Sequence, residues 1–240
     1  MPVYLLSDDL TFPHPSLATK EGLLAVGGDL SPERLLLAYA NGIFPWYSKN
    51  DPILWWSPNP RLVLYLDQLR ISRTLARTLR GGKFRITMDT RFHDLISACA
   101  QIRHPKRQAT WITPQMARAY IALHKLGYAH SVETWFKGEI VGGLYGVSLG
   151  KCFFGESMFS TLSDASKVAL VHLRDFLRQH NFDLIDCQTR SDHLISLGAR
   201  EVAREDFLAQ LARSLKRSTL MGPWRLPSSE STEPLSPLPK

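Results

Sequence analysis

The stretch AHSVETWFKGEIVGGLYGVSLGKCFFG, residues 129–155, decides the fold of this chain. Residues 129–136 and 140–148 are rich in β-branched and aromatic side chains, which favour strands. Two short turns, each with a glycine, separate these runs from each other and from a third apolar run at 152–155. The pattern predicts a β-hairpin that leads into a further strand, so we expect the middle of the chain to form a sheet.

Helical and strand patterns flank this stretch on both sides. Capping residues, terminating glycines and apolar spacing predict helices, whereas alternation of apolar and polar residues predicts strands. The expected helices cover 32–40, 72–79, 92–100 and 114–126. Two more helices are expected, one capped by Ser163 and Asp164 that runs to 179 and a last one that begins at 204–207. The expected strands cover 61–65, 84–88 and 183–188. This order predicts an α+β or mixed α/β fold with helices on either side of the sheet.

The chain divides by composition into three parts. Residues 1–60 are rich in Gly, Pro and Trp and are expected to form a small N-terminal domain, in which 44–47 and 55–58 have the composition of loops. Residues 61–226 carry the α/β pattern and form the expected main domain. Residues 227–240 are dominated by Pro, Ser and Glu, so they are predicted to be disordered.

Composition also limits the class of protein. No run of about 18 apolar residues exists, so we expect no membrane span and no membrane partner. The three cysteines, Cys99, Cys152 and Cys187, are widely spaced, which argues against a disulfide framework or a zinc site and for a reducing cytoplasm. The histidines, His193 included, lack metal-ligand spacing, so no metal is expected. We expect a monomer.

Positive charge is concentrated in one segment of the chain. The formal net charge is +7, but residues 68–132 contain twelve Lys and Arg residues and only two acids, Asp89 and Asp94. That segment therefore carries +10 and the rest of the chain −3. A concentrated positive field attracts a polyanion and accelerates its capture, so the distribution predicts a nucleic-acid partner.

Basic residues of this segment follow the spacing of one helix face. Intervals of 3, 4 and 3 residues place the first four on one side of a helix, and two more follow; the six are Arg70, Arg73, Arg77, Arg80, Lys83 and Arg85. Guanidinium groups can bind phosphate oxygens through two hydrogen bonds at once. The alternative is the solvated face of an ordinary helix. The lack of nearby acids, and a second basic cluster at Arg103, Lys106 and Arg107, favour phosphate binding.

Aromatic side chains near the basic segment are candidates for stacking on nucleobases. Trp46 lies in a stretch bounded by Gly and Pro, and Trp111 follows the second basic cluster. Stacking on an exposed ring contributes roughly 1–3 kcal/mol per base. Packing in the core is the alternative for both rings, and it is the favoured interpretation for Trp55, Trp56 and Trp135.

Polar side chains interrupt two apolar strands. Glu156 stands among aromatic residues at 153–159, and Asp186 and Gln188 are two residues apart, on the same face of an expected strand. A buried charge is unfavourable unless it has a partner or a function. An adjacent carboxylate and carboxamide can hydrogen-bond each other and a third group, so these residues are candidates for catalysis. Acids that cap or support the core are the alternative.

Seven motifs occur in the order found in one known family. They are LLAVGGDL at 23–30, GIFPW at 42–46, WWSP at 55–58, TWIT at 110–113, GESMFS at 155–160, ASK at 165–167 and IDCQ at 185–188. Over about residues 20–215 the chain resembles the bacterial leucyl/phenylalanyl-tRNA–protein transferases. The resemblance implies a small N-terminal domain joined to a domain with the acyltransferase fold of the GCN5-related N-acetyltransferases (GNAT).

The resemblance also implies a reaction. The α-amino group of a protein with N-terminal Arg or Lys attacks the ester carbonyl of Leu-tRNA, or of Phe-tRNA or Met-tRNA. The product is a peptide bond and a destabilising N-terminus that marks the protein for degradation. Because the ester is already activated, neither a cofactor nor ATP is expected. The implied partners are aminoacyl-tRNA and such acceptor proteins, in the cytoplasm.

Roles for individual residues follow by similarity. Trp46 and Trp111 hold the terminal adenosine, and Asp186 and Gln188 form the catalytic pair with Glu156 close by. The six basic residues, selected by their spacing rather than by similarity, are expected to bind the tRNA backbone. The apolar pocket for the amino-acid side chain consists of Leu144, Phe153, Met158, Leu170, Leu173 and Ile185. Leu144 and Leu173 stand where the family pattern has Met and Phe, which bears on the preference among Leu, Phe and Met. Ser191 stands where that pattern has Asn, which removes any contact of a side-chain amide there.

Chemistry at this site is expected to centre on the carboxamide. Asp186 orients Gln188, whose carbonyl oxygen accepts a proton of the incoming amine, and either residue is the ultimate proton acceptor. Glu156 pairs with the Arg or Lys side chain of the acceptor or steadies its amine. Backbone N–H groups are the expected donors to the oxyanion.

Three other functions compete with this hypothesis. An acetyl-coenzyme A N-acetyltransferase needs a glycine-rich loop near residue 160, and residues 160–164 contain no glycine. A non-catalytic RNA-binding module explains the charge and the aromatic residues but gives Asp186, Gln188 and Glu156 no role. A peptidoglycan-type aminoacyl-tRNA transferase shares the donor but has a longer chain.

Overall fold

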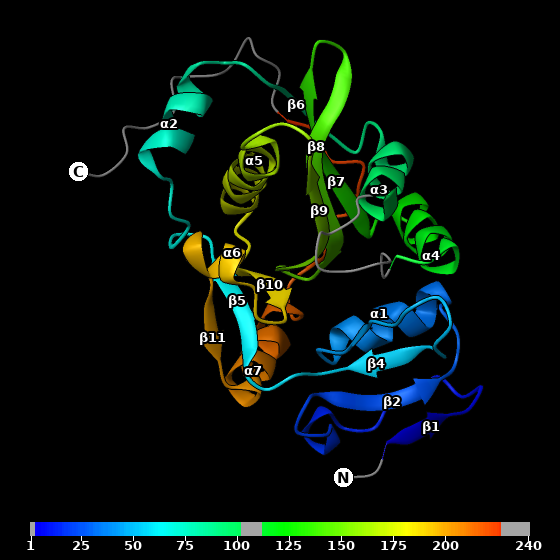
Figure 1. Cartoon of the computed structure of the whole chain (residues 1–240). Coiled ribbons are helices and arrows are strands. Elements are labelled where there is room, and N and C mark those ends of the chain that lie inside the picture. Colours follow the sequence, from blue (N-terminus) through cyan, green and yellow to red (C-terminus); the bar gives the residue numbers. More distant parts are fainter. Residues whose placement is uncertain (1–2, 102–111, 227–240) are drawn as a thin grey trace.

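Two β-sheets of unequal size form the framework of the protein. The computed structural model describes residues 3–101 and 112–226. The smaller sheet has the strand order β1-β2-β4-β3 and lies beside α1 and a short 3-10 helix, η1 (Figure 1). Its elements are β1 (Tyr4–Leu6), η1 (Pro15–Leu17), β2 (Leu23–Gly27), α1 (Pro32–Ala40), β3 (Phe44–Pro45) and β4 (Leu54–Trp56).

The larger sheet has seven strands in the order β11-β5-β10-β9-β8-β7-β6. Its strands are β5 (Arg61–Tyr65), β6 (Arg85–Met88), β7 (Ala129–Phe136), β8 (Glu139–Leu149), β9 (Cys152–Ser160), β10 (Leu184–Gln188) and β11 (Arg200–Val202). Strands β9 and β10 run parallel, and every other neighbouring pair is antiparallel. The hairpin and third strand expected from residues 129–155 are confirmed as β7, β8 and β9.

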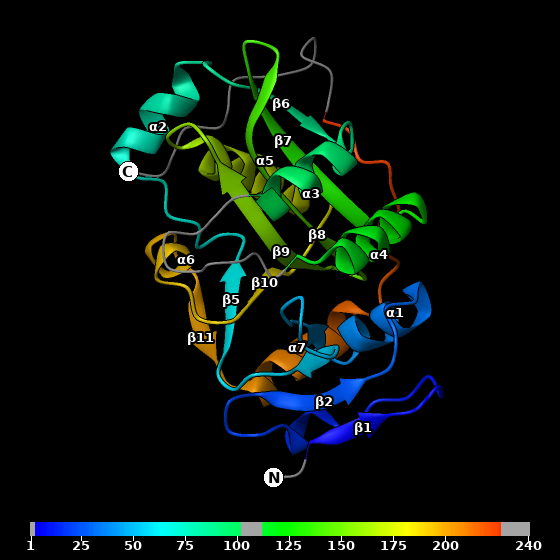
Figure 2. The ribbon, with the colours of Figure 1, turned by 45° about the vertical axis from the view of Figure 1, so that its right-hand side comes forward.

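Helices cover both faces of the larger sheet. Helix α5 packs on one face, and α3 and α4 pack on the other (Figures 1 and 2). The helices are α2 (Arg73–Arg80), α3 (Phe92–Gln101), α4 (Pro114–Lys125), α5 (Ala165–Gln179), α6 (Asp192–Ser196) and α7 (Arg204–Ser214). The predicted mixed α/β fold with helices on either side of the sheet is confirmed. Within the described residues, the helices lack the length and apolarity that crossing a bilayer requires.

Each face of the larger sheet carries its own hydrophobic cluster. One cluster joins α3, α4, α7 and the smaller sheet, and it includes Tyr39, Tyr120 and Phe154. The other cluster lies under α5 and includes Phe153, Leu170 and Ile185. Because Phe153 and Phe154 are successive residues of β9, their side chains enter different clusters, as strand geometry requires.

Each of the two Trp- and Pro-rich runs of the N-terminal region begins in a strand, so the prediction of loops was wrong for residues 44–45 and 55–56, whereas residues 46–47 and 57–58 lie outside the strands. Trp55 and Trp56 belong to β4, which pairs with both β2 and β3. Trp55 is fully buried and its indole N–H donates to the carbonyl of Gly27 at 2.9 Å. Pro45 is tolerated because β3 is an edge strand. The Pro-rich composition of these runs is typical of loops, but backbone pairing with residues distant in the sequence makes residues 44–45 and 55–56 strands.

Helix α5 begins differently from the expected cap. Asp164, at its N-cap position, has φ 66° and makes no side-chain capping hydrogen bond. Its carboxylate accepts instead from the ammonium of Lys167 at 2.9 Å and from the hydroxyl of Thr78 in α2 at 3.2 Å. The start of α5 therefore carries a negative charge that helps to hold α2 in place.

Candidate active site

Two β-bulges, on neighbouring strands, position the polar residues of the site. In β9, Ser157 pairs with Tyr145 and Gly155 pairs with Gly146, so Glu156 is the extra residue between them. In β10 the register shifts between Asp186 and Gln188 in the same way. A bulge changes the direction of a side chain relative to the regular strand. The parallel ladder between β9 and β10 ends at Phe154 and Asp186, just before these bulges.

Glycine makes the bulge in β9 possible. A Cβ atom at Gly146 would lie 2.1 Å from the carbonyl oxygen of Phe154, which is far inside van der Waals contact. Gln188 itself has φ 63°, a left-handed conformation that is uncommon for residues other than glycine. Both irregularities depend on contacts between strands, so local sequence patterns do not reveal them.

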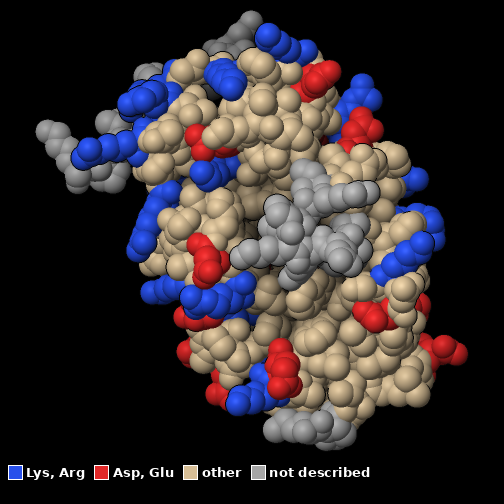
Figure 3. All heavy atoms as spheres, in the orientation of Figure 1, with Lys and Arg blue, Asp and Glu red and all other residues tan. Residues whose placement is uncertain are grey.

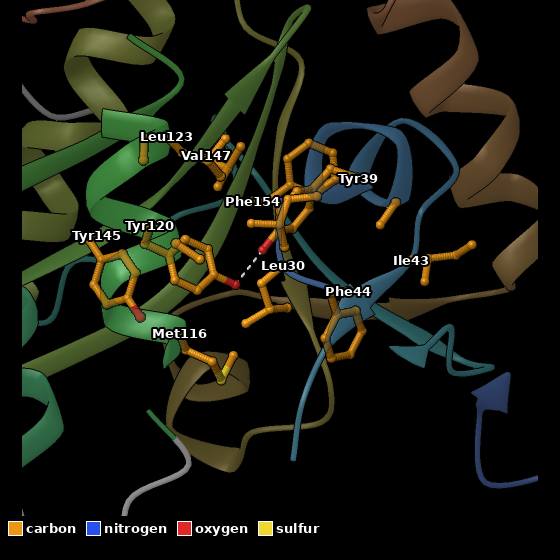
Figure 4. Packing of buried hydrophobic residues seen from close by; sticks show 14 of the residues in the cluster. Leu30, Tyr39, Ile43, Phe44, Met116, Tyr120, Leu123, Tyr145, Val147 and Phe154 are labelled. Atoms are coloured by element: carbon orange, nitrogen blue, oxygen red, sulfur yellow. Dashed lines mark hydrogen bonds between the residues drawn. The ribbon is translucent and has the colours of Figure 1, made fainter. Parts of the chain in front are cut away.

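Glu156 accepts hydrogen bonds from three side chains on three different elements. The hydroxyl of Tyr39, in α1, donates to Oε1 at 2.7 Å, and that of Tyr120, in α4, donates to Oε2 at 2.7 Å. The Nε2 amide of Gln188 donates to Oε1 at 2.6 Å. The two phenol oxygens are also 2.7 Å apart. The dashed line in Figure 4 marks this contact between Tyr39 of α1 and Tyr120 of α4.

Burial sets the electrostatics of this cluster. Glu156 is 8% exposed, and burial raises its pKa to about 7, opposing the hydrogen bonds from Tyr120, Tyr39 and Gln188, which lower it. Burial also raises the pKa of Tyr39 and of Tyr120 well above the usual range, and the nearby Glu156 charge acts in the same direction. The phenols therefore stay protonated, and Glu156 is the group that changes charge near neutral pH.

Asp186 is held in a buried ion pair with Arg61. The guanidinium donates from Nε to Oδ1 at 2.8 Å and from Nη2 to Oδ2 at 2.6 Å, and both side chains are fully buried. Arg61 also donates to the carbonyl of Gly42 at 3.1 Å, and its guanidinium contacts the rings of Phe44 and Phe207. The pair thus connects β10 to the chain segment that leads to Trp46.

The link between Asp186 and Gln188 differs from the expected contact between side chains. Asp186 Oδ1 accepts from the backbone N–H of Gln188 at 2.9 Å, and the carboxamide of Gln188 bonds Glu156 instead. Among the residues that the structure describes, no hydrogen bond reaches Gln188 Oε1. The carboxamide is therefore fixed through its nitrogen, and its oxygen retains its capacity to accept.

The six expected pocket residues lie together in the hydrophobic cluster under α5. Leu144, Phe153, Leu170, Leu173 and Ile185 are each at most 5% exposed, and Met158 is partly buried against them. Cross-strand pairing places Leu144 opposite Met158 and Ile185 beside Phe153. The structure therefore brings these residues together, on the face of the sheet opposite Tyr39 and Tyr120.

Of the two expected adenosine-binding residues, one is described. Trp46 is half-buried directly after β3, its ring centroid 5.6 Å from that of Trp56. The indole of Trp56 donates to the Trp46 carbonyl at 2.7 Å, which holds the backbone of this segment in place. Trp111 lies outside the described residues, as do Arg103, Lys106 and Arg107.

The six basic residues form an exposed surface around α2 and β6, here called the basic surface. Arg73, Arg77 and Arg80 lie on α2, whereas Arg70 precedes the helix. The prediction of four arginines on one helix was therefore wrong for Arg70. All six are exposed, and none forms an ion pair within the described part of the chain. Lys83 lies over the rings of Phe84 and Phe136, and Arg85 lies over Trp135. Figure 3 shows Lys and Arg along the side of the molecule where α2 lies.

Three residues of the site were missed from the sequence. Tyr39 and Tyr120 had the spacing of apolar core residues in helices, and nothing local distinguishes them. Arg61 is different, because it is a charged residue in an apolar strand, the same signal that selected Asp186. Ser191, where the family pattern has Asn, caps α6 by accepting from the N–H of Leu194 at 3.4 Å.

Comparisons with known proteins agree with this architecture. The family model for leucyl/phenylalanyl-tRNA protein transferase matches residues 63–212, and the model for the N-terminal domain of the same family matches residues 28–59. A protein of Desulforapulum autotrophicum named leucyl/phenylalanyl-tRNA–protein transferase is 56% identical over 93% of this chain and 98% of its own. One of the same name from Desulfatibacillum aliphaticivorans is 57% identical over 95% of this chain and 98% of its own.

Another relative of that name, from Syntrophobacter fumaroxidans, is 58% identical over 90% of this chain and 92% of its own. Among solved structures, that of L-PGS from Bacillus licheniformis is 12% identical, covers 68% of this chain and 51% of that chain, and has a TM-score of 0.38. At that score the likeness carries no conclusion about this chain.

Proposed function

Because this chain belongs to the leucyl/phenylalanyl-tRNA protein transferase family, we propose that it transfers Leu, and also Phe and Met, from aminoacyl-tRNA to proteins with N-terminal Arg or Lys. The observation that carries the proposal is the Gln188 carboxamide, fixed between Asp186 and Glu156 at the end of two strands. The new N-terminal residue marks the acceptor protein for degradation. The reaction takes place in the cytoplasm, and the enzyme acts as a monomer.

The reaction needs a neutral amine, alignment and a stabilised oxyanion, and Gln188 serves the alignment. An α-amino group has a pKa of about 7.7–8.0, so the acceptor arrives largely protonated at neutral pH. Gln188 Oε1 accepts an N–H of the amine and directs its lone pair at the ester carbonyl. Supporting this role, the carboxamide nitrogen is already anchored on Glu156, which prevents the side chain from rotating.

Asp186 acts in this proposal as a positioning residue. Its carboxylate is fully buried and accepts two hydrogen bonds from Arg61 and one from the backbone of Gln188, so in this proposal it does not contact the substrate. It holds the backbone N–H of Gln188 and thereby supports the left-handed conformation at that residue. The ion pair with Arg61 makes this support rigid.

Binding of the donor uses three further parts of the molecule. The hydrophobic cluster around Leu144, Met158 and Ile185 receives the leucyl side chain. Trp46 stacks on the terminal adenosine together with Trp111, and the basic surface binds the tRNA backbone. The region up to about residue 60 contributes Trp46 as a small N-terminal domain, and the GNAT-type domain that follows contributes the catalytic strands.

An acetyl-coenzyme A transferase fits these observations poorly. The pyrophosphate of such a cofactor needs the free N–H groups and positive end of a helix. At the start of α5 the carboxylate of Asp164 occupies this region and repels a phosphate.

A transfer assay tests the proposed function. Protein is incubated with Leu-tRNA carrying a labelled leucine and with two peptides that begin with Arg or with Ala. We expect label on the Arg peptide alone, with mass spectrometry locating the leucine at its N-terminus. Label on neither peptide refutes the function, and equal label on both refutes the acceptor specificity.

A further inference from the structure

Three oxygen-bearing side chains meet in a closed ring beside Gln188. Tyr39 contacts Glu156 Oε1, Tyr120 contacts Glu156 Oε2, and the two phenol oxygens contact each other, all at 2.7 Å. Each of these three contacts needs one proton to be a hydrogen bond. The number of protons in the ring therefore depends on the charge of Glu156.

The two charge states of Glu156 differ in the number of protons that the ring contains. With Glu156 ionised, the two phenols supply two protons for three contacts, so one pair of oxygens is close without a proton between them. With Glu156 protonated, there are three protons for three contacts. Tyr120 then donates to Tyr39, Tyr39 to Oε1, and the carboxylic acid at Oε2 to Tyr120. The ring accepts one proton when the Tyr120 hydroxyl hydrogen turns from Oε2 to Tyr39, and no heavy atom has to move.

The Glu156 carboxylate can accept a further hydrogen bond. A carboxylate offers about four lone-pair positions, two on each oxygen. Tyr39 and Gln188 use both positions on Oε1, whereas Oε2 is bonded by Tyr120 alone among the described residues. One lone pair of Oε2 therefore has no donor among the described residues, on the carboxylate whose other oxygen anchors the Gln188 carboxamide.

We propose that Glu156, Tyr39 and Tyr120 form a proton-accepting ring that deprotonates the α-ammonium group of the acceptor protein. This inference rests on the proposed transfer reaction. One N–H bond of the ammonium breaks, its proton moves to the Glu156 carboxylate, and the neutral amine attacks the ester carbonyl carbon. As the C–N bond forms and the ester C–O bond breaks, a second N–H proton passes to the departing ribose oxygen. Glu156 then releases its proton to solvent, so the cycle yields an amide, a ribose hydroxyl and one free proton.

The surroundings support a group that titrates near neutral pH. Burial brings the pKa of Glu156 to about 7, close to that of an α-ammonium group, so the proton transfer is nearly balanced in free energy. The titratable and charged groups near it are Tyr39 of α1, Tyr120 of α4, Tyr145 of β8, Cys99 of α3, Asp186 of β10 and Arg61 of β5. Arg61 neutralises Asp186, and burial keeps the phenols and the thiol protonated, so the ring titrates through Glu156.

Deletion of single hydroxyl groups tests the ring. Tyr39→Phe and Tyr120→Phe each remove one donor to the ionised carboxylate, so each should raise the pKa of Glu156. Tyr65→Phe is the matched control, because the Tyr65 hydroxyl donates at 2.7 Å to Gln210, outside the ring. The carboxyl signal of Glu156 is followed against pH by NMR of protein labelled with carbon-13 at glutamate Cδ. Glu156→Gln identifies the signal.

The rate of transfer is measured on the same proteins at saturating Leu-tRNA and Arg peptide. A lost hydrogen bond to a charged group predicts an upward shift of about one pH unit in both the carboxyl titration and the acid limb of the rate. Below the midpoint, each ring variant should therefore be about tenfold slower than wild type, and the control unchanged. The α-amino group of the peptide is the same throughout, so its titration does not move.

Two results would overturn the ring while leaving the transfer reaction in place. One is a Glu156 carboxyl that titrates near 4.5 in the wild type; the other is an acid limb that stays fixed when the carboxyl titration moves. A wild-type protein that transfers no leucine at any pH would refute both the proposed function and the ring.

Discussion

The buried network around Glu156 and the basic surface on α2 and β6 use charge in opposite ways. In the network, Arg61 and Asp186 are fully buried and neutralise each other, and Glu156 bonds three side chains. On the basic surface, Arg77 and its neighbours are exposed and lack an ion-pair partner within the described residues. The first arrangement fixes geometry and resists salt, whereas the second produces a field that salt screens. Changes in the network should therefore affect stability and rate, and changes on the surface should affect capture of tRNA.

The largest expected effect is loss of one partner of the buried ion pair. Arg61→Met leaves Asp186 buried and unpaired, which should lower the free energy of unfolding by about 3–5 kcal/mol. The double variant Arg61→Met/Asp186→Leu removes the unpaired buried charge as well, so it should recover most of the lost free energy of unfolding. Urea denaturation measures all three proteins. An Arg61→Met protein as stable as wild type would mean that the pair contributes no constraint.

A pH-dependent effect on stability should follow from Glu156. Its pKa rises from 4.5 in the unfolded chain to about 7 in the folded protein, so the folded state holds the proton more tightly. Its contribution to stability is fully present below pH about 4.5, decreases between 4.5 and about 7, and is lost above. Glu156→Gln mimics the protonated acid at every pH. The variant should gain on the order of 3 kcal/mol over wild type between pH 4.5 and pH 8.

Urea denaturation of both proteins at several pH values gives this difference directly. All other titrating groups are common to the two proteins, so they cancel in the comparison. A difference that stays constant with pH would show that Glu156 ionises at its ordinary pKa.

Shortening the carboxamide should slow transfer without weakening capture. Gln188→Asn keeps the amide, and Asn tolerates the left-handed backbone at this position. The shorter side chain cannot both bond Glu156 and reach the amine, so we expect a loss of about 10²-fold in rate at saturating substrates. Affinity for Leu-tRNA, measured by filter binding, should equal that of wild type. A rate within twofold of wild type would remove Gln188 from the mechanism.

The smallest effect is expected on the basic surface, and it depends on salt. Arg77→Glu/Arg80→Glu removes two phosphate contacts and should lower the slope of log affinity against log salt by about 1.4–1.8. The control Arg213→Glu/Lys216→Glu reverses two exposed charges at or just after the end of α7, a helix that lies apart from α2 (Figures 1 and 2). Equal slopes in the two variants would mean that only net charge matters and that the surface has no defined role.

Local patterns predicted the parts of the fold that local physics determines. Strands such as Arg61–Tyr65 and helices such as Pro32–Ala40 occupy the expected residues, because periodicity and caps fix them. The strand β4 was missed, because its Trp-rich sequence becomes a strand only by pairing with β2. The basic surface was predicted from a stretch of sequence with many basic residues and few acids. This was possible because exposed charged side chains do not depend on contacts with distant residues.

The candidate site was predictable only in part, for the same reason. Glu156, Asp186 and Gln188 were recognised as polar residues in apolar strands. Their hydrogen-bond partners are distant in the sequence: Arg61 is 125 residues from Asp186, and Tyr39 is 117 residues from Glu156. The bulges that turn Glu156 and Gln188 toward each other arise from strand register, which short motifs do not encode.

Single-turnover transfer at increasing salt tests the division between capture and chemistry most directly. Labelled Leu-tRNA is titrated over the protein at each salt concentration with saturating Arg peptide, and the saturated rate constant is separated from the apparent dissociation constant. We expect the dissociation constant to rise steeply with salt while the saturated rate constant stays the same. A saturated rate constant that falls in parallel with affinity would contradict this expectation, because the buried network would then depend on the exposed charges.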